Sequence, residues 1–218
     1  MNERTLTVDV YSDVICPWCY VGKRRLERAL QQVGNAVKIR VAWRPFQLNP
    51  TMPKDGMDRT TYLEAKFGNL DTFKEMEQRL LEAGSAERIQ FAFEKIVRTP
   101  NTFHAHRLIW YARQHDGQDA VVDQLFKGYF EKGLDIGSVS VLVEVADRAG
   151  LKAAPFLESD EGVAEVKAEE AVGHKLGIRG VPCIIVNKIC AISGAQPVET
   201  FVSAIDQLST GIQTRVLS

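Results

Sequence analysis

The sequence lacks a strong net charge, and it lacks a long apolar run. Its 218 residues carry 27 basic and 28 acidic side chains, for a formal net charge of −1. Such a balance gives no general attraction to nucleic acid or to an anionic membrane surface, so we expect neither as a partner. No apolar run approaches the roughly 20 residues of a membrane-spanning helix, and the N-terminus shows no secretory-signal pattern. We therefore expect a cytoplasmic protein.

The rest of the composition is that of an ordinary globular protein. Hydrophobic residues make up 45% of the chain and charged residues 25%. A chain of this length buries a sizeable core, and we expect one domain or one domain with a large insertion. A basic cluster, Lys23-Arg24-Arg25 with Arg28, lies within the first predicted helix. We expect it to be a solvated helix face rather than a phosphate site.

Cysteine is scarce, with four in the chain, but two of them form Cys16-Pro17-Trp18-Cys19 between a strand-like and a helix-like run. Unpaired N–H groups and the positive end of the dipole at a helix N-terminus stabilise a thiolate. We therefore predict that Cys16 is the attacking thiol. Cys19 follows one helical turn later, close enough to attack a mixed disulfide on Cys16 and to release the partner.

Three other interpretations of this pair are less favoured. A structural zinc site needs two more ligands, and Cys183 and Cys190 are not spaced as a second CxxC, so we expect no metal. A permanent disulfide is disfavoured in a compartment that keeps thiols reduced. Two unrelated buried cysteines would not require the observed order of strand, dithiol and helix.

Hydrophobic periodicity predicts a strand–helix–strand opening followed by helices. We expect strands over 5–11 and 37–43 around a helix over 17–33. The middle of the chain is expected to be all helical, in pieces over 58–67, 71–83, 101–115, 119–132 and 138–149. A further helix is expected from near residue 159, capped by Ser159 or Asp160, to Gly173–Gly177.

The C-terminal part returns to strands and a last helix. Residues 181–186 and 189–192 predict a hairpin with a two-residue turn at Asn187-Lys188, followed by a helix over 197–208. The expected organisation is α/β, with two parts of one domain over 1–50 and 151–210, a helical insertion domain over 51–150 and a flexible tail over 211–218.

Motifs along nearly the whole chain resemble the DsbA-type thioredoxin-like oxidoreductases, more narrowly their FrnE-like branch. The segments that carry the resemblance are CPWCYVGK at 16–23, WRPFQLNP at 43–50, RTPNT at 98–102 with AHRL at 105–108, GVP at 180–182 and SGAQ at 193–196. The resemblance implies a thioredoxin-like fold (β-α-β…α-β-β-α) in which the large helical insertion domain covers the active site.

The resemblance also implies that Pro182 is a cis-proline facing the dithiol. Val181 would then offer its backbone N–H and C=O groups to an extended peptide and place a substrate sulfur beside Cys16. The alternative for Val181-Pro182 is the start of an edge strand in the trans form. Together with these two residues, Pro17 and Trp18 are expected to contact the substrate.

Several polar residues near these motifs have more than one interpretation. Asp13, three residues before Cys16, is either a carboxylate that helps to move a proton to or from Cys19 or part of the helix N-terminal turn or cap. Asn101 and Thr102 are best explained as a helix start. His104 and His106 fall on different helix faces, which argues against a paired metal site, and we expect one in the core and one at the surface.

Cys183 and Cys190 stand where relatives are expected to carry aromatic residues. With a two-residue turn they would lie diagonally on one face of the hairpin, in poor geometry for a disulfide. Small buried side chains are the favoured interpretation. A sharper hypothesis is that Cys183, directly after Pro182, traps oxidation products of the dithiol.

The sequence thus favours a thiol–disulfide oxidoreductase, with disulfide isomerase as one form of that activity, that acts on a cysteine-containing protein or a small thiol or disulfide. No cofactor is expected, although a helix N-terminus can hold a glutathione carboxylate, which leaves glutathione open as a co-substrate. One alternative is a glutathione-dependent isomerase or transferase of the 2-hydroxychromene-2-carboxylate isomerase or kappa type. Another is a non-catalytic metal-binding or chaperone-like protein. The direction of the reaction and the oligomeric state are not encoded.

Overall fold

A four-stranded sheet forms the centre of the structure, a computed structural model that describes residues 5–34, 37–68 and 70–210. Its strands are β1 (Thr5–Ser12), β2 (Lys38–Pro45), β5 (Cys183–Val186) and β6 (Cys190–Ser193). They lie in the order β2-β1-β5-β6. β1 pairs with β2 in parallel and with β5 antiparallel, and β5 and β6 form an antiparallel hairpin. This arrangement agrees with the thioredoxin-like fold predicted from the sequence.

The two faces of the sheet carry different helices. Leu6, Val8 and Val10 of β1 point to the face that packs in the main core with α1 (Pro17–Val33) and α9 (Val198–Ser209). Tyr11 points to the other face, beside Cys183. On that face α8 (Val163–Lys175) approaches so closely that a Cβ on its Gly173 would lie 2.9 Å from the Tyr11 ring. The side-chain alternation of β1 therefore decides which residues meet α1.

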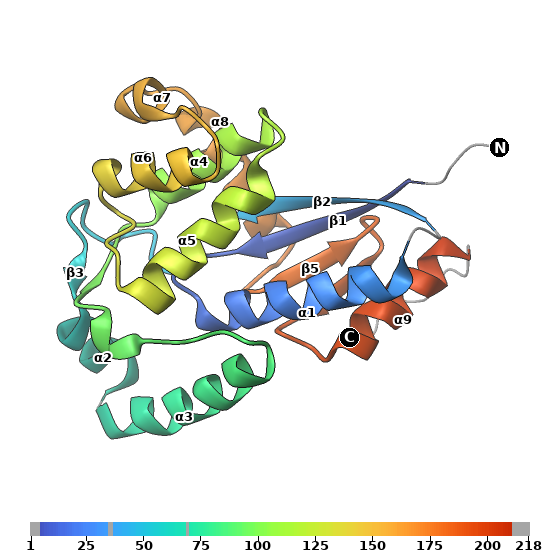
Figure 1. The fold of residues 1–218 in the computed structure, drawn as a ribbon, viewed down its shortest axis with the longest axis horizontal. Coiled ribbons are helices and arrows are strands. Elements are labelled where there is room, and N and C mark those ends of the chain that lie inside the picture. The colour runs from blue at the N-terminus through green and yellow to red at the C-terminus, as the bar shows by residue number, and fades with distance from the viewer. Residues whose placement is uncertain (1–4, 35–36, 69, 211–218) are drawn as a thin grey trace.

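The helical insertion lies between β2 and α8 along the chain and gathers at the end of the sheet where β1 finishes and α1 begins (Figure 1). Its helices are α2 (Arg59–Phe67), α3 (Leu70–Ala86), α4 (Phe103–Arg113), α5 (Gln118–Lys132) and α6 (Val139–Arg148). The short α7 (Ala154–Glu158) follows beyond residue 150 and contacts α4 and α6. None of the helices in the described part of the chain is long and apolar enough to cross a membrane.

The sequence predicted an entirely helical insertion, and this prediction is wrong. A short antiparallel ladder joins β3 (Met57–Asp58) to β4 (Arg98–Thr99), and a 3-10 turn, η1, covers Phe93–Lys95. These pieces are too short to leave a periodic signal in the sequence. The ladder ties the start of α2 to the segment that leads into α4.

The helix expected from near residue 159 is divided into α7 and α8. Ser159 does not cap α8, because its hydroxyl donates to the Phe156 carbonyl (2.8 Å) and closes the end of α7. α8 begins at Val163, and its N-cap residue is Gly162 with φ +75° rather than Asp160. A left-handed backbone of this kind favours glycine. The expected tail over 211–218 lies outside the described residues.

The β5–β6 hairpin has a three-residue loop and not the predicted two-residue turn. Asn187 and Lys188 both have positive φ, as expected for such a turn, but Val186 pairs with Cys190, so Ile189 is left in the loop. A shift of one residue sends every side chain of a strand to the other face. Cys190 therefore joins the main core while Cys183 lies on the opposite face of the sheet, which corrects the predicted diagonal arrangement.

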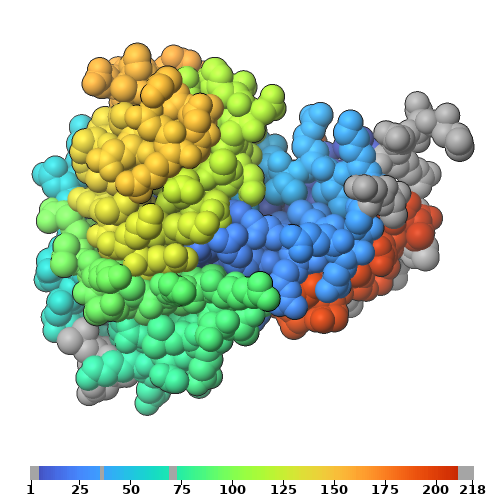
Figure 2. Space-filling model, in the orientation of Figure 1, coloured from blue at the N-terminus to red at the C-terminus, as the bar shows by residue number. Residues whose placement is uncertain are grey.

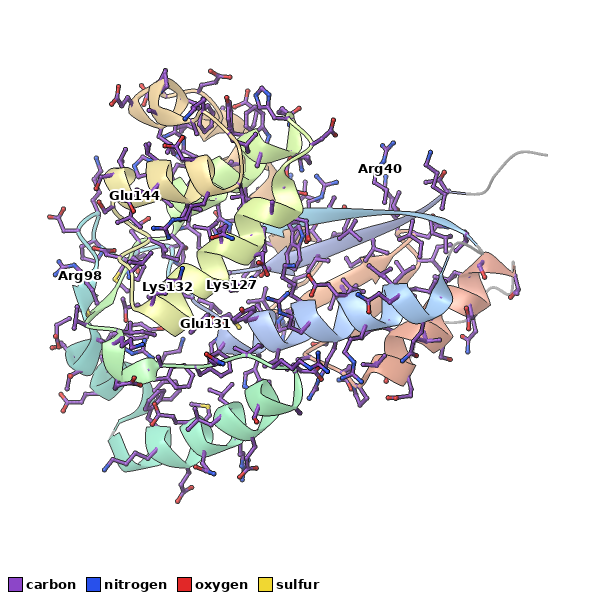
Figure 3. The ribbon with its side chains drawn as sticks, viewed as in Figure 1. Arg40, Arg98, Lys127, Glu131, Lys132 and Glu144 are labelled. Atoms are coloured by element: carbon purple, nitrogen blue, oxygen red, sulfur yellow. The ribbon has the colours of Figure 1, made fainter. Side chains whose placement is uncertain are left out.

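The basic cluster of α1 is also not the solvated face that we expected. α1 runs between α5 and the chain that follows α3 (Figure 2). Lys23 has a side-chain exposure of 1% and pairs with Glu27 and with Asp119 (3.3 Å) and Asp123 (3.8 Å) of α5. On the same side, Tyr20 donates to Glu131 (2.7 Å) of α5, which Figure 3 labels beside α1. The cluster joins the thioredoxin part to the insertion.

Candidate active site

The dithiol lies where β1 ends and α1 begins. The Cys16 N–H donates to the Asp13 carbonyl (3.0 Å), and this turn leads into α1. Cys16 is the N-cap residue, with φ −92° and ψ 111°, and Pro17 occupies the first helical turn. Proline suits this position because it lacks an N–H group that would be unpaired there and because its φ is already helical. The Cys16 carbonyl accepts from Cys19 N–H (3.0 Å), so the first turn fixes both cysteines.

The two thiols have different environments. Cys16 has an exposed fraction of 5% and Cys19 of 1%. Burial, followed by the hydrogen bond and charge interaction with Cys16, raises the pKa of the Cys19 thiol well above its ordinary value. Contacts with Ser12 and the Asp13 backbone act in the opposite direction. Cys19 therefore keeps its proton in the dithiol state, and an attacking thiolate in this pair belongs on Cys16.

The segment before β5 lies beside Cys16. The Cys16 thiol donates to the Val181 carbonyl (3.6 Å), and the Val181–Pro182 peptide bond is cis, the form that the family resemblance implies. A Cβ on Gly22 of α1 would lie 3.1 Å from Cγ of Pro182, so the absence of a side chain permits this close packing. The structure thus brings Cys16, Cys19 and Val181-Pro182 together, with Pro17 and Trp18 half-buried beside them.

Asp13 forms the turn before α1 through its carbonyl, as one of the two interpretations predicted, but its side chain does not cap the helix. Its Oδ2 accepts from the Leu48 N–H (2.7 Å), and α1 has no side-chain cap hydrogen bond. Its other oxygen, Oδ1, lies 3.4 Å from Nε2 of His106, and both residues are buried. Among the residues that the structure describes, neither of these two atoms has a hydrogen-bond partner. His106 is therefore the core member of the predicted histidine pair, and it comes from α4 of the insertion.

The helix start near Asn101 also differs in detail from the expectation. α4 begins at Phe103, and Thr102 is its N-cap residue without a side-chain cap bond. Instead, the Asn101 side chain accepts from the Phe103 N–H (2.9 Å) and donates to the Met52 carbonyl (2.7 Å). Nδ1 of half-buried His104 accepts from the Arg107 guanidinium (3.0 Å). Asn101 thus satisfies the helix start and holds the loop after β2.

Sequence reasoning missed two residues beside the dithiol, Ser12 and His106. The Ser12 hydroxyl is buried and, like Asp13 Oδ1 and His106 Nε2, has no hydrogen-bond partner within the described ranges. The signal for Ser12 was its place in β1, where Leu6, Val8 and Val10 predict an apolar residue at the next inward position. No comparable signal existed for His106, because its meeting with Asp13 depends on how the insertion packs.

The position of Cys183 argues against the hypothesis that it traps oxidation products. Its side chain packs with Tyr11 and Phe46 on the sheet face away from α1, and burial raises the pKa of its thiol. A buried thiol with a raised pKa is a poor nucleophile. Within the described ranges, no group of three or more His, Cys, Asp or Glu side chains is arranged to hold a metal ion.

The chain is similar in sequence and in structure to known proteins. The family model described as DSBA-like thioredoxin domain matches residues 7–206. The probable DsbA oxidoreductase SCO1869 of Streptomyces coelicolor is 31% identical and has a TM-score of 0.87, over 98% of this chain and 93% of that one. The protein YwbO of Bacillus subtilis (strain 168) is 25% identical over 205 residues, 92% of this chain and 96% of that protein.

A more distant similarity concerns the fold alone. The cytosolic disulfide reductase DsbM of Pseudomonas aeruginosa is 17% identical with a TM-score of 0.64, over 94% of this chain and 100% of that one. A second structure of DsbM contains GSH.

Proposed function

Because the chain belongs to the DSBA-like thioredoxin domain family, we propose that it is a thiol–disulfide oxidoreductase. Cys16 attacks a substrate disulfide or is attacked by a substrate thiol, and Cys19 resolves the mixed disulfide. The observation that carries this proposal is the asymmetry of the pair. Cys16 begins a helix beside the Val181 carbonyl, whereas burial and Cys16 itself raise the pKa of Cys19.

The reaction in the reducing direction has two exchanges. The Cys16 thiolate attacks one sulfur of the substrate disulfide, and the other substrate sulfur leaves as a thiolate. Cys19 then loses its proton and attacks the Cys16 sulfur, which forms the Cys16–Cys19 bond and releases the second substrate thiolate. Two electrons pass from the dithiol to the substrate. The reverse sequence oxidises a substrate dithiol.

Val181 and Pro182 would position the substrate. The Val181 carbonyl faces the Cys16 sulfur, and both residues directly precede β5. An extended peptide can add its backbone to exposed N–H and C=O groups of this kind, which places its cysteine beside Cys16. Pro17 and Trp18 are half-buried next to the reacting sulfur and would contact the neighbouring residues of that peptide.

We propose a cysteine-containing protein or a small thiol or disulfide as the partner, and the cytoplasm as the site of action. Glutathione is a co-substrate candidate, since the fold neighbour DsbM is named as a cytosolic disulfide reductase and one of its structures contains GSH. In a reducing compartment the dithiol would work mainly as a reductant or isomerase.

Defined glutathione redox buffers followed by acid quenching and mass analysis test this proposal. We expect a reversible Cys16–Cys19 disulfide with a midpoint between about −270 and about −120 mV, the span from thioredoxin to a strong oxidant. Cys16→Ser should abolish the exchange, whereas Cys183→Ser, a buried thiol on the other sheet face, should leave it unchanged. Glutathione that persists on Cys16 would instead support a glutathione-dependent isomerase or transferase, and full exchange activity in Cys16→Ser would refute the mechanism.

A further inference from the structure

Ser12 is a polar residue in an apolar position. It is the last residue of β1, and the alternation of that strand points its side chain to the same sheet face as Leu6, Val8 and Val10. That face is covered by α1. Ser12 has an exposed fraction of 5%, so its hydroxyl is removed from water in a place where a valine or leucine would pack.

The Ser12 hydroxyl has no hydrogen-bond partner, sulfur included, in the described part of the chain. A buried polar group without a partner costs free energy, and such groups in a folded protein call for a reason, among them a catalytic role. Cys19 lies in the first turn of α1, the helix that covers this sheet face, and is 1% exposed, so its sulfur is buried at the end of the sheet where β1 finishes with Ser12. The Ser12 hydroxyl and the Asp13 backbone both act to lower the pKa of the Cys19 thiol, against the larger effect of its burial.

We propose that Ser12 is a further catalytic residue, whose hydroxyl donates a hydrogen bond to the Cys19 thiolate that forms during resolution. The hydrogen bond from Ser12 is weak or absent while Cys19 is a protonated thiol, and it becomes strong when the Cys19 sulfur carries a negative charge. Together with the Asp13 N–H it forms a two-donor site for a sulfur anion, arranged before the charge develops. The inference rests on the proposed oxidoreductase function and concerns its second step alone.

The first exchange does not create charge on Cys19. Cys16 attacks the substrate while Cys19 keeps its proton. In the second exchange the Cys19 S–H bond breaks and its proton is released to water, the Cys19–Cys16 bond forms, and the bond between Cys16 and the substrate sulfur breaks. Removal of the Ser12 hydroxyl should therefore slow resolution and spare the first attack.

A two-phase assay with the full chain separates these steps. The reduced protein is mixed with 5,5′-dithiobis(2-nitrobenzoate) in a stopped-flow instrument. Attack by Cys16 releases the first thionitrobenzoate, and attack by Cys19 on the mixed disulfide releases the second. The informative pair of variants is Ser12→Val and Ser12→Thr, because the two side chains have the same shape and differ by the hydroxyl.

We expect Ser12→Val to slow the second phase about tenfold or more, the usual size for the loss of a hydrogen bond to a charged group, and to leave the first phase within about twofold. Ser12→Thr should restore the second phase. The matched control is Thr99→Val, which removes another buried hydroxyl away from the thiols and should change neither phase. Ser12→Ala repeats the test if valine does not fit beside Cys19.

Three outcomes would overturn the inference: a second phase of normal rate in Ser12→Val and Ser12→Ala, equal slowing of both phases, or failure of threonine to restore the rate while the variant folds normally. Failure of the proposed function has a different signature. In that case the wild-type protein itself would release no second thionitrobenzoate.

Discussion

His106 and Arg107 are neighbours on α4, yet they belong to polar clusters of opposite kinds. Arg107, 1% exposed, donates to the carbonyls of Phe156 (3.0 Å) and Glu161 (2.7 Å), and it also contacts the carbonyls of Leu157 and Ser159. We call this set the Arg107 network. His106 faces Asp13 instead, and neither the two facing atoms nor the Ser12 hydroxyl has a hydrogen-bond partner in the part of the chain that the structure describes. Ser12, Asp13 and His106 form the dithiol cluster.

The Arg107 network stabilises the fold, whereas the dithiol cluster has polar groups available for the reaction. In the Arg107 network one guanidinium satisfies the carbonyls at the end of α7 and in the loop before α8, so a buried charge is fully used in the resting protein. The dithiol cluster keeps donors and acceptors uncommitted beside a sulfur that changes its charge. Unsatisfied buried groups cost stability. Three of the six buried side-chain atoms without a hydrogen-bond partner in the described residues belong to the dithiol cluster, and active sites are where such a cost is expected.

The largest effect on stability is expected from Arg107→Met, which keeps the volume but removes every donor of the Arg107 network. The free energy of unfolding should fall by about 3–5 kcal/mol, because the buried carbonyls lose their partner. Urea denaturation measures this loss. The control is Arg148→Met, which breaks an exposed pair with Glu144 (3.4 Å) and should cost less than about 1 kcal/mol. A similarly small loss in Arg107→Met would remove the distinction between the two clusters.

Lys23→Met tests a second satisfied charge, at the contact between α1 and α5. We expect a loss of about 2–3 kcal/mol in the free energy of unfolding, since Lys23 is buried among three carboxylates whose partner disappears. Lys127→Met is the control, because Lys127 pairs with the same Asp123 (2.7 Å) from a position with 38% side-chain exposure. Equal losses in the two variants would contradict a special role for burial.

The stability loss in Lys23→Met should also depend on pH. Burial alone would raise the pKa of Asp123, but the hydrogen bond with Lys127 and the charges of Arg24 and Lys23 hold it below its ordinary value. A lowered native pKa stabilises the fold above the unfolded value of about 3.9, and that stabilisation is lost as the pH falls through the native pKa. The difference in stability between wild type and Lys23→Met should therefore be full above about pH 4 and shrink in more acidic solution. A pH-independent difference would contradict this account.

The smallest effect is expected from His106→Gln in the dithiol cluster. The His106–Asp13 contact of 3.4 Å satisfies neither atom, so its loss should cost about 1 kcal/mol or less. A double-mutant cycle with Asp13→Asn, followed by urea denaturation, measures the coupling directly. A coupling as large as the loss in Arg107→Met would show that this pair also holds the structure.

The parts of the fold with local signals could be predicted from the sequence. α1 has its predicted bounds, because Pro17 begins it and Gly34 follows its last residue. The short elements β3, β4 and α7 could not be found, since pairing and packing with distant segments form them rather than periodicity. The register of the β5–β6 hairpin was predicted wrongly because Ile189 lies in the loop, and this one extra loop residue moves the Cys190 side chain to the opposite face of the sheet.

For the candidate site, the sequence identified the cysteines and Val181-Pro182 but not the polar groups around them. Motif spacing marks residues that are close in the chain or belong to a resemblance. It does not show that a helix more than 80 residues later brings His106 to Asp13, nor that α5 buries Lys23. These contacts depend on the packing of the insertion against the thioredoxin part, which no local pattern describes.

The start of α1 offers a way to detect the redox state of the dithiol without a chemical probe on the cysteines. Its N-cap residue is a cysteine without a capping hydrogen bond, where serine or aspartate would ordinarily secure the first turn. A negative sulfur at that place strengthens the turn through the helix dipole, and a neutral disulfide does not. The amides of Cys19 and Tyr20, which donate to the Cys16 carbonyl at 3.0 and 3.4 Å, should thus exchange with deuterated solvent at rates that differ between the reduced and oxidised protein.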